Sequence, residues 1–179
     1  MEKLIKVTEK KYIPKVYQNT PIGKLIEYHN FNESCEKVKL PEILIGTCMD
    51  NRIQIKIPQN FAYVIRTGGA NLHNSDFYVS YALAVGKVKA IAIIVHNDCG
   101  MINLAGRKDI IVNGIVRATG WTQVHAKDYF NSFAPICEIV NEVTFAKSEV
   151  SRLRQLYPDI LVAPLLYNVD DDLLYVISE

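Results

Sequence analysis

Apolar residues along this chain fall either into short dense runs or into longer stretches with the spacing of one helix face. Short, mostly apolar runs lie at 42–47, 61–66 and 90–95. Such runs are typical of strands that are buried on both faces of a sheet. Between the last two runs, residues 74–89 repeat apolar side chains at helical spacing. The order strand, strand, helix, strand predicts an α/β fold, with a mostly parallel sheet flanked by helices and joined by right-handed crossovers.

Capping residues and periodicity predict further helices. Thr20 followed by Pro21 is typical of a helix start, and a helix over about 21–30 follows. Thr122 is placed to cap a second helix. Residues 138–157 carry apolar side chains alternately four and three apart, which is the stripe of an amphipathic helix.

Two later segments favour different structures. Residues 103–120 contain Asn113-Gly114 between apolar runs, a hairpin signal, but also apolar residues at helical spacing; we favour a helix. Residues 160–169 and 173–178 are apolar runs separated by three aspartates. They predict a hairpin that places an antiparallel strand at the edge of the sheet near the C-terminus.

The composition is that of a globular protein. Of 179 residues, 49% are hydrophobic and 22% charged, with a formal net charge of +1. This length predicts a single domain over 1–179, with residues 1–20 as an N-terminal arm that is solvated or docks a partner. The charge gives no sign of nucleic-acid binding. No apolar run reaches the ~18 residues of a membrane span, and no secretory signal is recognisable, so we expect a cytoplasmic protein with reduced cysteines.

Two of the predicted strands end in residues that bind metals. The run 42–47 leads into Cys48, Asp50 and Arg52, and the run 90–95 leads into His96 and, three residues later, Cys99. In an open parallel sheet the carboxyl ends of the strands meet at one edge, where ligands bind. If the two strands are neighbours, Cys48, His96 and Cys99 converge there.

Two thiolates and one imidazole suit zinc, and three protein ligands with an exchangeable fourth position form the pattern of a catalytic site. Asp50 is the obvious labile fourth ligand. It could instead stay ionised and off the metal, held by a bidentate pair with Arg52, and orient a zinc-bound hydroxide. A plain salt bridge between Asp50 and Arg52 is the simpler alternative.

Several nearby residues have both a structural and a functional interpretation. Gly100 either permits a positive φ angle or directs its N–H at a substrate oxygen. For Asp98 we favour a hydrogen bond to the backbone of its own turn, and for Arg66 a structural role. Cys35 and Cys137 lie on predicted helices, and we expect both in the core.

Three segments, "CMDNR", "IRTGGAN" and "HNDCGM", resemble the β-class carbonic anhydrases. The resemblance covers about residues 41–101 and returns at 160–178. It implies zinc on Cys48, His96 and Cys99, an Asp50–Arg52 dyad, and an α/β fold built as a dimer or a dimer of dimers. It also implies reversible hydration of carbon dioxide to bicarbonate and a proton, with no organic cofactor and no membrane or nucleic-acid partner.

The chain also departs from the family pattern. Asn51 stands where the family commonly has serine, Arg66-Thr67-Gly68-Gly69 replaces the family's R-N-A-G, and residues 102–140 match nothing in the family. Three alternatives follow: a hydrolase of a related heterocumulene such as carbon disulfide or carbonyl sulfide, a silent zinc protein with Asp50 permanently ligated, and a metal-free protein that uses Cys48 or Cys99 as a reactive thiol.

Overall fold

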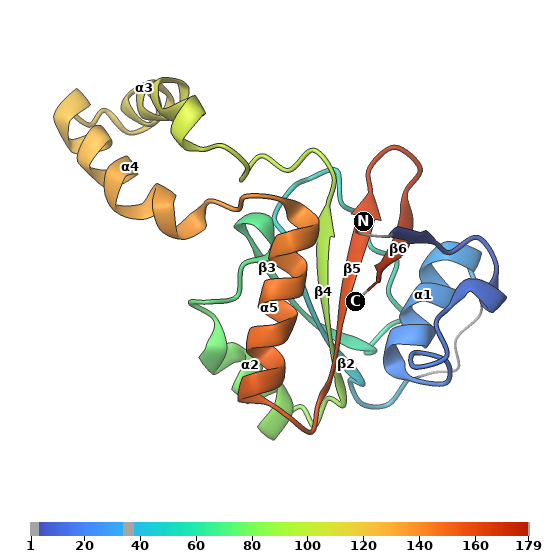
Figure 1. The fold of residues 1–179 in the computed structure, drawn as a ribbon. Coiled ribbons are helices and arrows are strands. Elements are labelled where there is room, and N and C mark those ends of the chain that lie inside the picture. Colours follow the sequence, from blue (N-terminus) through green and yellow to red (C-terminus); the bar gives the residue numbers. More distant parts are fainter. Residues whose placement is uncertain (1–3, 34–37, 179) are drawn as a thin grey trace.

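A six-stranded mixed sheet forms the centre of the computed structural model, which describes residues 4–33 and 38–178 (Figure 1). The strand order is β1-β6-β5-β4-β2-β3. The strands are β1 (Leu4–Lys6), β2 (Ile43–Cys48), β3 (Ala62–Thr67), β4 (Ala90–His96), β5 (Leu161–Asn168) and β6 (Leu173–Ile177).

Four adjacent strands, β5, β4, β2 and β3, run parallel, as the sequence predicted. β2 pairs with β3 on one side and with β4 on the other, and β4 also pairs with β5. Every residue of β2 and β4 is buried, which explains why these strands appear as dense apolar runs. Because the strands are parallel, Cys48 at the end of β2 and His96 at the end of β4 lie at the same edge of the sheet.

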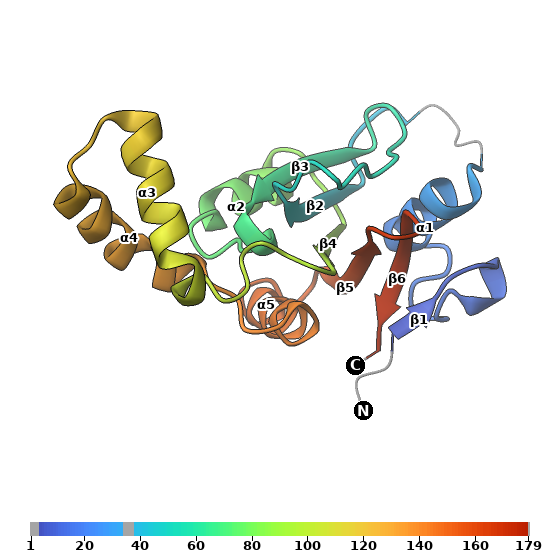
Figure 2. The same cartoon turned by 90° about the horizontal axis from the view of Figure 1, so that it is seen from above.

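Helices cover both faces of the sheet. Alternate residues of β2 and β4 belong to two apolar clusters, one shared with α1 and the other with α2 and α5. Figure 2 shows α1 and α5 on opposite sides of the sheet. The helices are α1 (Pro21–Phe31), α2 (Asp76–Ala84), α3 (Lys108–Thr119), α4 (Gln123–Cys137) and α5 (Glu142–Leu156), with short 3₁₀ turns at Lys10–Tyr12, Gly68–Ala70 (η2) and Ala105–Arg107. In the described ranges, no helix combines the length and apolar character needed to cross a bilayer.

The predicted helix starts at Thr20 and Thr122 are confirmed, and both hydroxyls accept a backbone N–H three residues on. Two predicted helices are too long. The helix predicted at 74–89 ends at Ala84, and Lys87 has a φ of 58° that no helix continues. α5 begins at Glu142 rather than at 138, because the side chain of Asn141 caps it by accepting from Thr144 N at 3.0 Å.

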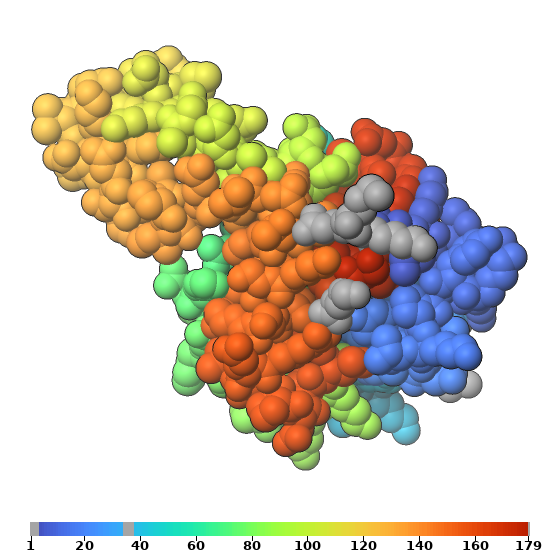
Figure 3. All heavy atoms as spheres, in the orientation of Figure 1, coloured from blue at the N-terminus to red at the C-terminus, as the bar shows by residue number. Residues whose placement is uncertain are grey.

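Residues 108–119 are helical, so the helix favoured for the ambiguous segment is correct and the hairpin at Asn113-Gly114 does not form. α3 and α4 pack against each other and project from the body as a helical arm (Figures 1 and 3). The arm has its own small apolar cluster, which contains Leu104, Val112, Ala126, Phe130 and Ala134. Phe133 on α4 lies outside this cluster and is 51% exposed.

The C-terminal hairpin forms as predicted, with β6 antiparallel to β5. Beyond β6, residues 4–6 add β1 to the same antiparallel edge, and Val7, Ile13 and Tyr17 are buried in the core. The prediction that residues 1–20 form a solvated or partner-docking arm is therefore wrong for the described part of this segment. The Asn30 side chain of α1 fixes this region. Its Nδ2 donates to the carbonyls of Val7 and Leu174 at 2.8 and 2.9 Å, and its Oδ1 accepts from Leu174 N at 2.9 Å.

A matched pair of substitutions tests the burial of β2. Ile45 is fully buried in the strand, whereas Ile110 on the arm is 74% exposed. We expect Ile45→Ala to lower the free energy of unfolding by about 2–5 kcal/mol, because it removes buried methyl groups and leaves a cavity. Ile110→Ala, the same chemical change at the surface, should alter it by less than about 0.5 kcal/mol. Urea denaturation followed by circular dichroism measures both; equal effects would contradict the assignment of β2 as a central buried strand.

Candidate metal centre

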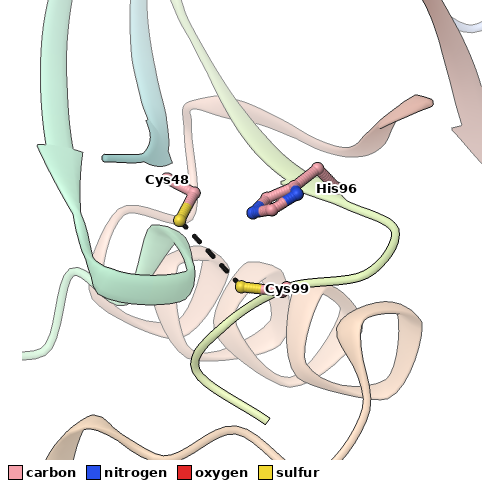
Figure 4. Close-up of side chains that lie close together, drawn as sticks. All are labelled: Cys48, His96 and Cys99. Atoms are coloured by element: carbon pink, nitrogen blue, oxygen red, sulfur yellow. Dashed lines mark hydrogen bonds between the residues drawn. The ribbon is translucent and has the colours of Figure 1, made fainter. Parts of the chain in front are cut away.

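Three potential metal ligands meet at the carboxyl edge of the sheet. Cys48 is the last residue of β2, His96 is the last of β4, and Cys99 lies in the loop that follows β4. The two sulfurs are 4.0 Å apart, and the ligand atoms of all three residues lie within 4.8 Å of one another. Figure 4 shows the three side chains facing a common point. The structure therefore brings together the three residues that the sequence singled out.

The loop after β4 returns Cys99 to the end of β2. Asp98 has a φ of 55°, a left-handed conformation that reverses the chain direction directly before Cys99. Gly100 does not adopt a positive φ, so the conformational explanation for this glycine is wrong and Asp98 makes the turn instead. Among the described residues, a Cβ atom at position 100 would have a single neighbour within 4 Å, Arg107 Nη1 at 3.8 Å.

His96 is oriented so that one ring nitrogen has no partner. Its Nδ1 lies 2.9 Å from the carbonyl oxygen of Asn97. Because a carbonyl only accepts hydrogen bonds, Nδ1 carries a proton, so in the neutral imidazole the lone pair is on Nε2. Nε2 is buried and has no hydrogen-bond partner among the described residues. Buried polar atoms are nearly always paired, so this nitrogen has the environment of a metal ligand.

The two thiols differ in their ionisation. The hydrogen bond from Cys99 and the neighbouring His96 lower the pKa of Cys48 to about 4, despite the opposing effect of burial. The Gly69 N–H also donates to Cys48 Sγ, at 3.3 Å. The thiolate of Cys48 in turn raises the pKa of Cys99, as does burial. A cation between the two sulfurs would favour the thiolate form of both cysteines, since a coordinating thiol is deprotonated.

Asp50 and Arg52 form the pair that the sequence predicted. Arg52 Nε and Nη2 donate to the two carboxylate oxygens of Asp50 at 3.0 and 2.9 Å, and the Arg52 N–H adds a third bond at 2.9 Å. These hydrogen bonds lower the pKa of Asp50 to about 2, so its carboxylate is ionised at neutral pH. Asp50 Oδ2 lies 3.9 Å from His96 Nε2, at the margin of the cluster.

Asp98 has a role that the sequence analysis missed. Its side chain does not bind the backbone of its own turn. Its Oδ2 accepts from Arg52 Nη1 at 2.8 Å, and its carbonyl accepts from Arg52 Nη2 at 2.9 Å. Arg52 therefore joins the loop after β2 to the loop after β4, and it lowers the pKa of Asp98. Only the spatial approach of the two loops reveals this pairing, because the residues are far apart in the sequence.

Three other residues complete the comparison with the sequence predictions. Arg66 donates to the carbonyls of Cys48 and Ile53 at 3.2 and 3.1 Å, which supports a structural role for it in the loop after β2. Cys137 is exposed at the end of α4, so its predicted core position is wrong. Cys35 lies outside the described residues.

Comparisons with known proteins place the fold. The sequence matches no family model and no curated protein. Solved structures do match. Carbonic anhydrase from Glaciozyma antarctica is 20% identical, and the match covers 92% of this chain and 99% of that chain with a TM-score of 0.63. β-Carbonic anhydrase isoform I from Trichomonas vaginalis is 22% identical, and the match covers 84% of this chain and 91% of that chain with a TM-score of 0.64. An apo carbon disulfide hydrolase is 22% identical, and the match covers 75% of this chain and 79% of that chain with a lower TM-score of 0.52. The chain therefore has the β-carbonic anhydrase fold, as the sequence motifs implied.

We expect Cys48→Ala and His96→Ala each to abolish stoichiometric metal binding, because each removes one of three clustered donors. Elemental analysis of protein purified without chelators would measure the metal content per chain. Cys137→Ala is the matched control, since it removes an exposed cysteine outside the cluster, and it should retain the metal. Full metal content in Cys48→Ala would contradict the assignment of the site.

Proposed function

We propose that this protein catalyses the reversible hydration of carbon dioxide to bicarbonate and a proton, with zinc held by Cys48, His96 and Cys99. One observation carries the proposal: a buried, unpartnered imidazole nitrogen lies beside two buried thiols. The donor set fits zinc. Zn–S bonds of about 2.3 Å in a tetrahedral site place two sulfurs about 3.8 Å apart, and the Cys48 and Cys99 sulfurs are 4.0 Å apart.

When bound, zinc supplies a water acidified enough to act as a nucleophile near neutral pH. The chain's own residues have distinct roles around that water. His96 presents Nε2, and the Asn97 carbonyl fixes the tautomer. The Asp50 carboxylate accepts a hydrogen bond from the water and so orients the water oxygen toward the carbon of carbon dioxide. Gly100, directly after Cys99, is proposed to donate its N–H to a substrate oxygen.

Arg52 is proposed to keep Asp50 in this role. It occupies both carboxylate oxygens of Asp50 and is itself held by Asp98. In this arrangement Asp50 is available to a water but not free to move onto the metal. In the reaction the water oxygen forms a bond to carbon, one water proton is lost to buffer, and bicarbonate leaves.

The alternatives differ in how well they fit. A silent zinc protein requires Asp50 on the metal, whereas Arg52 binds both Asp50 oxygens here. A metal-free protein that uses Cys48 or Cys99 as a reactive thiol would leave both buried sulfurs and the buried His96 Nε2 clustered without a shared ligand. Hydrolysis of carbon disulfide or carbonyl sulfide remains the second candidate, because a carbon disulfide hydrolase is among the structures with this fold.

We further propose that residues 1–179 form one domain that assembles as a homodimer or a larger homo-oligomer in the cytoplasm. Exposed apolar side chains support the assembly. Phe77 and Tyr78 on α2 are 78% and 63% exposed, and their ring centroids lie 6.4 Å apart. Exposed apolar side chains that cluster in this way are typical of protein contacts.

Stopped-flow measurement of carbon dioxide hydration by zinc-loaded protein tests the proposed reaction. We expect turnover that is lost on zinc removal and restored by zinc. Carbon disulfide and carbonyl sulfide, assayed in parallel, should be poorer substrates. A zinc-loaded protein that is inactive with carbon dioxide above pH 8.5 but hydrolyses carbon disulfide would favour the second candidate, and inactivity with all three would favour the silent form.

Asp50→Ala separates metal binding from turnover. We expect this variant to keep one zinc per chain but to lose about 10²-fold or more in kcat, because the group that orients the water is gone. Since the Asp50 pKa is about 2, its carboxylate does not titrate between pH 5 and 9, and the loss should be similar across that range. Asp159→Ala, at an exposed position, is the control. Unchanged turnover in Asp50→Ala would refute the role given to Asp50.

A further inference from the structure

Helix α5 contacts the Cys99 loop and the turn whose Gly69 N–H bonds to Cys48, although it contributes no candidate ligand. Glu142, its first residue, accepts the backbone N–H of Cys99 at 3.3 Å. Glu149 accepts the backbone N–H of Leu72 at 3.3 Å, in the segment that follows η2. The two glutamates are seven residues apart, about two helical turns, and therefore lie on the same side of α5.

The carboxylate of Glu149 is held by several hydrogen bonds and ion pairs. Its side chain is fully buried. Arg152 donates to its two oxygens at 2.8 and 2.9 Å, and His73 Nε2 lies 3.0 Å from it. Arg152 also donates to Asp76 at 2.8 Å, at the start of α2. A buried carboxylate is tolerated only when it is paired and hydrogen-bonded, so this network sets the position of the Leu72 backbone relative to α5.

The Leu72 backbone is close in the chain to the N–H that contacts Cys48. Gly69, three residues earlier in η2, donates its N–H to Cys48 Sγ at 3.3 Å. The intervening turn is short and closed by a hydrogen bond from Asn71 N to Gly68 O at 3.2 Å. A shift of Leu72 away from α5 would therefore move the Gly69 N–H away from the sulfur.

We propose that α5 is the positioning element of the metal centre: Glu142 sets the Cys99 backbone, and Glu149 sets the turn whose Gly69 N–H bonds to Cys48. The proposal rests on the proposed metal binding by Cys48 and Cys99. One rigid helix then controls the separation of the two sulfurs, which come from segments about fifty residues apart in the sequence. Groups that orient metal ligands affect metal affinity even though they never touch the metal.

Cobalt(II) titration of the apoprotein tests this proposal, because thiolate-to-cobalt charge transfer reports the Co–S bonds and the visible bands report tetrahedral geometry. We expect Glu142→Ala and Glu149→Leu each to weaken cobalt binding by about tenfold or more and to change these bands. Glu142→Gln and Glu149→Gln retain an oxygen acceptor for the backbone N–H and should restore most of the affinity and the wild-type spectrum.

Glu138→Ala is the matched control. Glu138 also accepts a backbone N–H at 3.3 Å, from Ala105, but this contact joins the residue after α4 to the 3₁₀ turn before α3 and does not involve α5. We expect the cobalt affinity and spectrum of Glu138→Ala to equal those of the wild type. If Glu149→Leu fails to fold because Arg152 loses its partner, the partly exposed Glu142 still decides the question through its two variants.

The outcomes separate this proposal from the proposed function. Wild-type protein that binds no cobalt would overturn both. Wild-type protein that binds cobalt, with Glu142→Ala and Glu149→Leu indistinguishable from it in affinity and spectrum, would overturn only the role of α5. Variants that are less stable to urea but unchanged in their cobalt spectrum would show that the two glutamates serve stability alone.

Discussion

Parallel pairing of β2 with β4 is the constraint on which the rest of the site depends. Because neighbouring parallel strands end at the same edge, the last residue of β2 and the last residue of β4 are brought side by side. A left-handed Asp98 then turns the chain back, so that Cys99 reaches the same point. Three side chains from two distant segments converge without any irregularity inside the sheet itself.

Electrostatic pairing holds the loops that leave these strands. Arg52 binds the carboxylates of Asp50 and Asp98, one from each loop. Arg66, on β3, donates a hydrogen bond to the carbonyl of Cys48. Fixed cations thus surround a cluster that would otherwise concentrate negative charge from a thiolate and two carboxylates. The arrangement keeps Asp50 ionised, with its Oδ2 3.9 Å from His96 Nε2 at the margin of the cluster.

The predictable and unpredictable parts of this molecule differ in the range of the interactions that determine them. Dense apolar runs identified β2 and β4, and capping residues located the start of α1, because burial on both faces and capping are local properties of the sequence. The three clustered donors followed from strand ends alone. The pairing of Arg52 with Asp98 was missed because the two residues are 46 apart and meet only through folding. The exposure of Cys137 was missed because helical spacing shows that a side chain has a preferred face, but not whether anything covers that face.

The tautomer of His96 is set by a main-chain carbonyl rather than by a side chain. Every residue type at position 97 carries that carbonyl, so substitution there leaves the acceptor in place. The Asn97 side chain has a separate task, since its Oδ1 accepts from Val169 N at 2.8 Å and its Nδ2 donates to Asp170 at 3.1 Å. The acceptor of this imidazole is in that sense inherited with the backbone, whereas the Asp50–Arg52 pair depends on the side chains at both positions.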